Sequence, residues 1–229
     1  MTDYKSFVFT KVWKTVEKNS DDVPTGIIMA ELVPRKNAQG VCPECDRKCA
    51  TYDTATVPRR FEFVPLWNIP VYFLYKMRRI NCPTHGVVTE KVPWGDGKCT
   101  QTVERRQFLA NWARRLSWKE TAESFNTSPG KVYRAVKWIV DWGLKHRDLS
   151  GVTHIGVDEI HRGKGQKYMT LVYQLDGGDK RLLAVEKDRE EKSLERFFDE
   201  FDAGTDGEAK RSPGIQFVCG DMWKPYLNV

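Results

Sequence analysis

The sequence predicts a protein of three parts that differ in fold class: a small β module, an all-α segment and a mixed α/β domain. Three observations predict this division. Cysteine motifs bracket strand-like segments up to residue 94, apolar residues recur at helical spacing over 101–147, and strand-like segments return over 153–229. A chain of 229 residues is long enough for one large domain or for two to three small ones.

The charge is distributed unevenly along the chain. Residues 1–100 carry +4 (15 basic and 11 acidic residues), residues 101–147 carry +6 (10 and 4), and residues 148–229 carry −4 (12 and 16), which gives the net charge of +6. A basic middle segment indicates contact with nucleic acid, and an acidic final segment indicates cation binding. Because solvated helix faces are often basic as well, charge alone does not decide between these readings.

The sequence contains no segment typical of membrane insertion or secretion. Lysines interrupt the first residues, and the longest apolar run, 69–75, is far shorter than the roughly 20 residues that span a bilayer. We therefore expect a cytoplasmic protein without a membrane partner.

Residues 1–26 and 27–94 are predicted to form an N-terminal arm and a β module. The arm carries little periodic signal, so we expect a helix or a loosely ordered segment. In the module, residues 27–33, 61–66 and 71–80 are rich in aromatic and β-branched residues, which is typical of strands.

Two short motifs in the β module predict a zinc site. CPEC supplies Cys42 and Cys45, and CPTH, after 36 intervening residues, supplies Cys82 and His85. Four such ligands match the tetrahedral preference of Zn²⁺ and leave no open position, which indicates a structural site in a zinc-ribbon-like module. The alternative is that one ligand is wrong and Cys49 replaces it. Because so small a module has little core, metal removal is expected to unfold it.

Residues 101–147 are predicted to form a helix-turn-helix segment after a glycine-rich linker. The first helix has apolar residues at i, i+3, i+4 and i+7: Leu109, Trp112, Ala113 and Leu116. Ser117 and Glu120 form a capping box that starts the second helix, and Ser128 followed by Pro129 starts the third. The third helix is expected to bury five residues: Val132, Ala135, Val136, Ile139 and Val140.

The third helix also has a basic side, which predicts contact with DNA. A helix that follows a tight turn and has basic residues near its start has the geometry that enters a major groove. We expect four side chains to approach the DNA there: Ser128, Lys131, Tyr133 and Arg134. Contacts to phosphates are expected from five others: Lys137, Arg105, Arg106, Arg114 and Arg115. The alternative is a plain three-helix bundle that packs against its neighbours.

Residues 153–229 are predicted to form an α/β domain. The expected elements are three antiparallel strands, a helix and a buried fourth strand beside the first: 155–159, 168–175, 181–186, 192–201 and 215–219. The loop HRGKGQK and the hairpin signal DGGD connect the first three strands. This order is the opening of a ribonuclease-H-like fold.

Two acids follow the strands that this order places side by side. Asp158 comes after the apolar run 155–157, and Asp221 comes after the run 215–219. Two carboxylates at the ends of neighbouring strands are suited to hold Mg²⁺ or Mn²⁺ for phosphodiester chemistry. Glu159 points to the opposite face by strand alternation and is the weaker candidate. The alternative is that both aspartates merely cap strands or turns.

Several segments resemble a known family. CPEC, RRINCPTHG with the following VPW, the helix-turn-helix, HIGVDEIHRGKGQKYMTLVYQLD and GDMWKPY are similar to the amino-terminal part of bacterial insertion-sequence transposases of the ISL3 family. The resemblance implies a DDE transposase that binds the terminal inverted repeats of its element. It implies Mg²⁺-dependent cleavage and rejoining of double-stranded DNA by a homo-oligomer at the nucleoid, without a small-molecule substrate. By this resemblance, Asp158 is the first catalytic acid and Asp221 the second.

The third acid of that family, a Glu, lies downstream of the second, and no acidic residue follows Asp221 in this sequence. We therefore expect an incomplete catalytic domain over 153–229 and a chain that does not transpose alone. The alternative is a zinc and helix-turn-helix DNA-binding protein or regulator that derives from a transposase. Metal-dependent nicking of DNA distinguishes the two hypotheses.

Overall fold

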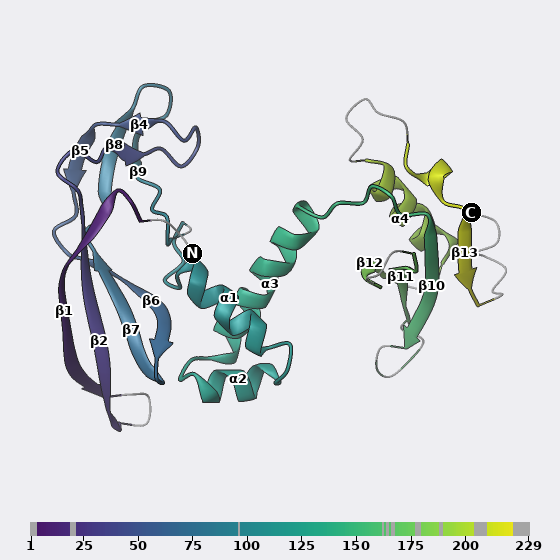
Figure 1. The fold of residues 1–229 in the computed structure, drawn as a ribbon, viewed down its shortest axis with the longest axis horizontal. Coiled ribbons are helices and arrows are strands. Elements are labelled where there is room, and N and C mark those ends of the chain that lie inside the picture. The colour runs from purple at the N-terminus through teal and green to yellow at the C-terminus, as the bar shows by residue number, and fades with distance from the viewer. Residues whose placement is uncertain are drawn as a thin grey trace. The chain divides into compact units, whose positions relative to one another are not determined.

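The computed structural model describes residues 4–18, 22–95, 97–161, 163, 165, 168–176, 180–187, 190–203 and 210–221. The chain divides into two compact units, Met1–His146 and Arg147–Val229 (Figure 1). Among the described residues, no helix is both long enough and apolar enough to cross a membrane.

The first unit contains a four-stranded sheet in the order β1-β2-β7-β6. Its strands are β1 (Phe7–Lys18), β2 (Pro24–Pro34), β6 (Arg59–Leu66) and β7 (Ile69–Tyr75). The central pair β2 and β7 is parallel, and each edge strand is antiparallel to its neighbour. Trp94 is fully buried against this sheet, and the rings of Phe7 and Tyr75 pack edge-on against it at centroid distances of 4.7 and 5.3 Å. Aromatic packing therefore forms much of the core of this sheet.

Strand β1 corrects the expectation of a helix or a loosely ordered arm over residues 1–26. Phe7–Lys18 pairs along its length with β2 and forms an edge of the sheet. Most of its side chains are exposed, and lysines 11, 14 and 18 lie among apolar residues. Lysines on an exposed edge strand discourage pairing with other chains, but they also hide the alternation that identifies a strand.

Two small sheets carry the cysteine motifs. One pairs β3 (Gly40–Val41) with β4 (Lys48–Cys49), and the other has the order β5 (Thr51–Thr54), β8 (Arg78–Cys82), β9 (Gly86–Thr89). The expected strand over 71–80 is therefore two strands, since the chain leaves the large sheet after Tyr75 and enters a small one at Arg78.

A buried ion pair beside β8 and β9 is hydrogen-bonded to the last residue of the large sheet. The side chains of Arg78 and Glu90 are 7% and 0% exposed, and Arg78 Nη2 donates to Glu90 Oε2 at 2.6 Å. Tyr75, the last residue of β7, donates its hydroxyl to Glu90 Oε1 at 2.6 Å. Burial and this hydrogen bond raise the pKa of Tyr75 well above its ordinary value, so the phenol remains a neutral donor. Every partner is hydrogen-bonded, as a buried charge requires.

Three helices complete the first unit: α1 (Val103–Trp112), α2 (Trp118–Ser124) and α3 (Pro129–Lys145). The predicted capping box is confirmed, because the Ser117 hydroxyl accepts from the backbone N–H of Glu120 and the Glu120 carboxylate accepts from that of Ser117. Ser128 caps α3 with Pro129 in its first turn, also as predicted. The core between the helices consists of Leu109, Ala122, Val132 and Ala135.

The helices pack directly on the large sheet. Glu62 of β6 donates its backbone N–H to the Thr100 carbonyl at 2.7 Å and accepts from the Thr102 N–H at 3.0 Å. Its carboxylate also pairs with Lys131 of α3. The predicted β module over 27–94 and the predicted helix-turn-helix segment over 101–147 thus lie within one compact unit.

The second unit is a four-stranded sheet in the order β12-β11-β10-β13, with one helix. Its elements are β10 (His154–His161), β11 (Tyr168–Gln174), β12 (Leu182–Lys187), α4 (Glu191–Asp202), the short 3₁₀ helix η1 (Ser212–Gly214) and β13 (Phe217–Gly220). β11 is antiparallel to both β10 and β12, and β13 lies parallel to β10. Phe197 and Phe201 of α4 are buried together with Ile155 and Val172 of the sheet.

The last strand differs from its prediction in burial. Phe217 and Val218 are 62% and 58% exposed, although a buried strand was expected over 215–219. The reason is that β13 is an edge strand, and among the described residues its sheet pairing is to β10 alone. Parts of the predicted HRGKGQK loop and DGGD hairpin, and residues 222–226 of GDMWKPY, lie outside the described residues.

Candidate metal centres and nucleic-acid interface

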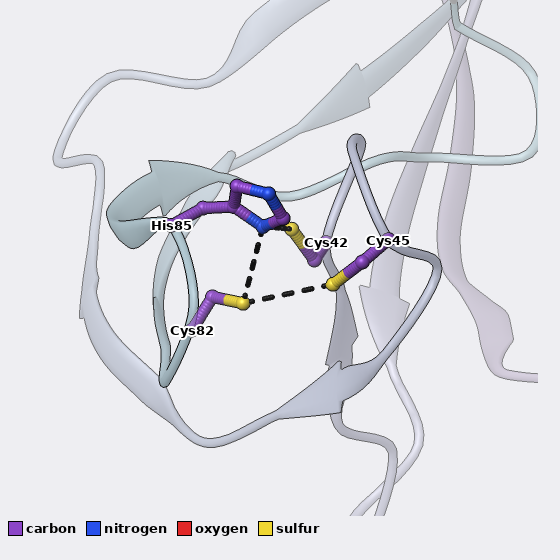
Figure 2. Close-up of side chains that lie close together, drawn as sticks. All are labelled: Cys42, Cys45, Cys82 and His85. Atoms are coloured by element: carbon purple, nitrogen blue, oxygen red, sulfur yellow. Dashed lines mark hydrogen bonds between the residues drawn. The ribbon is translucent and has the colours of Figure 1, made fainter.

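The four predicted zinc ligands lie together in the first unit. Figure 2 shows the side chains of Cys42, Cys45, Cys82 and His85 converging from two loops. All four ligand atoms lie within 4.8 Å of one another. Cys42 and Cys82 are buried, whereas Cys45 and His85 are exposed at the rim.

The distances between these ligand atoms fit a tetrahedral zinc ion. The Cys45 and Cys82 sulfurs are 3.7 Å apart, and His85 Nδ1 lies 3.6 Å from the sulfurs of Cys42 and Cys82. Zinc bonds of about 2.3 Å to sulfur and 2.0–2.1 Å to nitrogen give tetrahedral edges of about 3.8 Å between sulfurs and about 3.6 Å between sulfur and nitrogen. The donor set and its spacing therefore suit Zn²⁺.

The loop backbone prepares two of the thiols for metal binding. Backbone N–H groups of His85 and Thr84 lower the pKa of Cys82 to about 6. Burial raises the pKa of Cys42, but hydrogen bonds from the N–H groups of Cys45 and Glu44 outweigh burial and lower it overall. Since the thiolate is the form that binds metal, these loops favour the ligand state.

Cys49 is not a member of this cluster. Its side chain is buried beside Ile80, and its sulfur donates to the Arg47 carbonyl at 3.5 Å. Burial raises the pKa of Cys49, which suits a neutral apolar side chain rather than a ligand. The primary assignment of four ligands thus matches the geometry, and the alternative with Cys49 does not.

The predicted DNA-contacting side of α3 is largely accessible. Ser128, Tyr133 and Arg134 are exposed, and Lys137 is exposed but paired with Asp141 at 2.7 Å. Lys131 is half-buried, and its ammonium group forms an ion pair with Glu62 of the same unit. Of the expected phosphate contacts, Arg114 and Arg115 are exposed after α1, beside Trp112.

The structure corrects the prediction for Arg105 and Arg106. Both side chains are buried, at 5% and 4% exposed. Arg105 donates to the Phe125 carbonyl at 2.9 Å, and the Arg106 guanidinium lies 4.0 Å from the centroid of the Trp138 ring. They are unavailable for phosphate because they lie three and four residues before Leu109, on the inward face of α1.

The sequence patterns did not predict an exposed aromatic pair on the helices. Trp118 of α2 and Tyr133 of α3 are 44% and 47% exposed, with ring centroids 5.2 Å apart. Tyr133 was predicted, but Trp118 was not, because the first position of a helix gives no periodic signal. The pair extends the accessible face of α3 onto α2.

The two candidate catalytic acids occupy matching places on neighbouring strands of the second unit. The last paired residues of β10 and β13 are Val157 and Gly220, and Asp158 and Asp221 follow them directly. A Cβ at Gly220 would lie 3.2 Å from the Val157 carbonyl oxygen, so glycine permits the close approach of β13 just before the acid. Both aspartates are exposed, and Asp158 Oδ1 accepts from the Glu159 N–H at 2.7 Å. Neighbouring strands lie about 4.8 Å apart, which suits shared coordination of a divalent cation.

Comparisons with known proteins identify relatives over both units. The model of an ISL3-type family described as transposase matches residues 155–229. The transposase for insertion sequence element IS1557 of Mycobacterium tuberculosis, in strains CDC 1551 and H37Rv, is 27% identical over 212 residues, which is 92% of this chain and 46% of the relative. The chain thus spans about half the length of the curated relatives it matches. No solved structure matches.

The family match and the curated relatives cover the parts of the chain that carry the motifs quoted above. The match begins at the first residue of the apolar run before Asp158 and includes Asp221. The curated relatives extend the similarity over the cysteine motifs and the helices, because they cover 92% of the chain. The predicted resemblance is thereby confirmed, and the chain is a relative of insertion-sequence transposases, with the transposase family match in its second unit.

Proposed function

We propose that this chain is the DNA-binding and first catalytic portion of a DNA transposase. In this proposal the first unit holds structural zinc and binds the terminal inverted repeats of its element. The second unit has a ribonuclease-H-like arrangement and supplies two acids of a DDE set. The observation that carries the proposal is the matching position of Asp158 and Asp221 on adjacent parallel strands, within the segment that the transposase family matches.

The chemistry of the second unit depends on its carboxylates. Asp158 and Asp221 would hold Mg²⁺ or Mn²⁺, which supplies charge stabilisation for phosphodiester cleavage and strand transfer. The exposure of both side chains leaves them accessible to a DNA backbone. The strand order, with three antiparallel strands, a helix and a parallel fourth strand beside the first, supports the ribonuclease-H-like assignment.

The metal prediction is tested directly by paramagnetic broadening. Mn²⁺ added to the chain is expected to broaden the amide NMR signals of residues 156–159 and 218–221 before those of other strands. The Asp158→Asn variant should lose this selectivity, since one of two charged ligands becomes neutral. Asp148→Asn, in an exposed turn of the same unit, serves as the matched control. Equal broadening in wild type and Asp158→Asn would refute a shared cation site.

The DNA prediction is tested by substitution on α3. The wild-type chain is used to enrich duplexes from a random-sequence library, and the enriched duplex is bound at several salt concentrations. Arg134→Ala is expected to weaken binding by about tenfold and to reduce the slope of log K against log salt by about one, because one positive charge is removed from the side of α3 that faces the DNA. Lys36→Ala, an exposed lysine after β2, is the control. An unchanged salt slope for Arg134→Ala would argue against this face of α3.

A further inference from the structure

The hairpin between β6 and β7 ends in an unusual turn. Leu66 pairs with Ile69, which leaves Trp67 and Asn68 as the two central residues. Both have positive φ, 46° and 64°, so the turn has the handedness that suits twisted hairpins. Trp67 is 95% exposed, the highest value among the exposed large hydrophobic side chains in the part of the chain that the structure describes.

Folding does not account for a tryptophan at this position. Asparagine and glycine tolerate the left-handed region, and Asn68 fits that preference, but a bulky side chain is disfavoured there. A side chain that stays in water also gains nothing from apolar burial. The backbone conformation at Trp67 is unfavourable for a bulky residue, and the exposed indole gains no burial that would offset this cost. This combination points to a partner outside the unit.

The hairpin tip lies beside the turn of the helix-turn-helix. Phe63, Pro65 and Asn68 line a narrow cleft together with Phe125 and Asn126, the residues that connect α2 to α3. Figure 1 shows the ends of β6 and β7 next to this connection. Since Ser128 starts α3 two residues later, the tip flanks the end of α3 that is expected to enter a major groove.

The composition of the tip also fits a nucleic-acid partner. Residues 63–72 contain no charged side chain, and the one acidic residue that lines the adjoining cleft, Glu62, is paired with Lys131. Pro65 and Pro70 flank the turn, and their fixed φ angles restrict the hairpin near its tip. A register shift between Phe63 and Leu66 breaks the regular pairing just before it.

We propose that Trp67 contacts the same double-stranded DNA as α3, with its indole inserted against a base step in the minor groove next to the major-groove site. Apolar side chains act as such wedges in minor grooves, and aromatic rings stack on bases of any sequence. This inference rests on the proposed DNA binding of the first unit and assigns it a second contact element.

The test uses Trp67→Asn, because asparagine suits the left-handed position and the variant should keep the fold. Its affinity for the enriched duplex is expected to fall by about tenfold, as for the loss of one stacked ring. The salt slope should not change, since no charge is removed. Tyr52→Asn, an exposed aromatic residue on β5, should bind like wild type. In protein labelled with 5-fluorotryptophan, the ¹⁹F signal that Trp67→Asn removes should shift when the enriched duplex is added to wild-type protein.

The outcomes separate this inference from the proposed function. If Arg134→Ala weakens binding but Trp67→Asn does not, and the ¹⁹F signal stays in place, the hairpin contact is refuted and DNA binding by α3 stands. A change in self-association without a change in DNA affinity in Trp67→Asn would likewise overturn it. If the wild-type chain enriches no duplex, both proposals fail together.

Discussion

Replacing Cys82 with serine, or chelating the metal, should unfold the cysteine-containing sheets of the first unit. The buried core of these sheets comprises Cys42, Cys49, Ile80 and Cys82, so two of its four residues are candidate metal ligands. Structural zinc sites contribute on the order of 10 kcal/mol of binding free energy to folding, and so small a core does not replace that amount. Amide hydrogen exchange resolved by mass spectrometry should show lost protection over residues 40–54 and 78–89.

The control for this experiment is Cys99→Ser. Cys99 is half-buried and lies outside the four-ligand cluster. Wild type and Cys99→Ser should each bind about one zinc ion per chain, as expected for a single four-ligand site. Full zinc content in Cys82→Ser would contradict the ligand assignment, and so would a wild-type chain that binds none.

The second large effect is expected at the buried Arg78–Glu90 pair. Glu90→Ala leaves the Arg78 guanidinium without its carboxylate partner and should lower the free energy of unfolding of the first unit by about 3–5 kcal/mol. It also removes the acceptor of the Tyr75 hydroxyl, which adds an unsatisfied buried donor. Urea denaturation followed by hydrogen exchange measures the loss in the first unit separately from the second.

An exposed pair on the same strand provides the comparison. Arg79 pairs with Asp53, and these side chains are 55% and 42% exposed. Asp53→Ala should cost far less than Glu90→Ala because solvent screens the charges of the exposed pair. The double variant Arg78→Met, Glu90→Leu should regain stability relative to Glu90→Ala, since an apolar pair needs no partner. If Glu90→Ala and Asp53→Ala cost the same, the buried pair stabilises the unit no more than the exposed pair does.

Local signals in the sequence predicted the elements well where one side of each is buried. The capping box at Ser117, the start of α3 at Ser128 and the approximate positions of the strands in the second unit all follow from short-range patterns. The convergence of the four candidate metal ligands was predictable because ligand chemistry restricts both residue type and spacing.

The errors arose where tertiary packing decides the outcome. The residue type of Arg105 and Arg106 predicts exposed charges, but their spacing from Leu109 places both side chains on the buried face of α1. The sequence does not predict β1 because most of the side chains on both faces of this edge strand are exposed, so the strand lacks an apolar face. The exposure of Trp67 could not be predicted, since an aromatic residue between two strands ordinarily suggests core.

The contacts of Glu62 define where relatives of this chain could exchange parts. Its backbone pairs with Thr100 and Thr102, and its side chain pairs with Lys131, so this one residue links the large sheet both to the start of α1 and to α3. A chimera joined at the glycines near residue 97 would set foreign helices against an unmatched strand. A junction after His146 transfers the sheet, the Cys and His cluster and the helices together, so that every contact within this compact unit is kept.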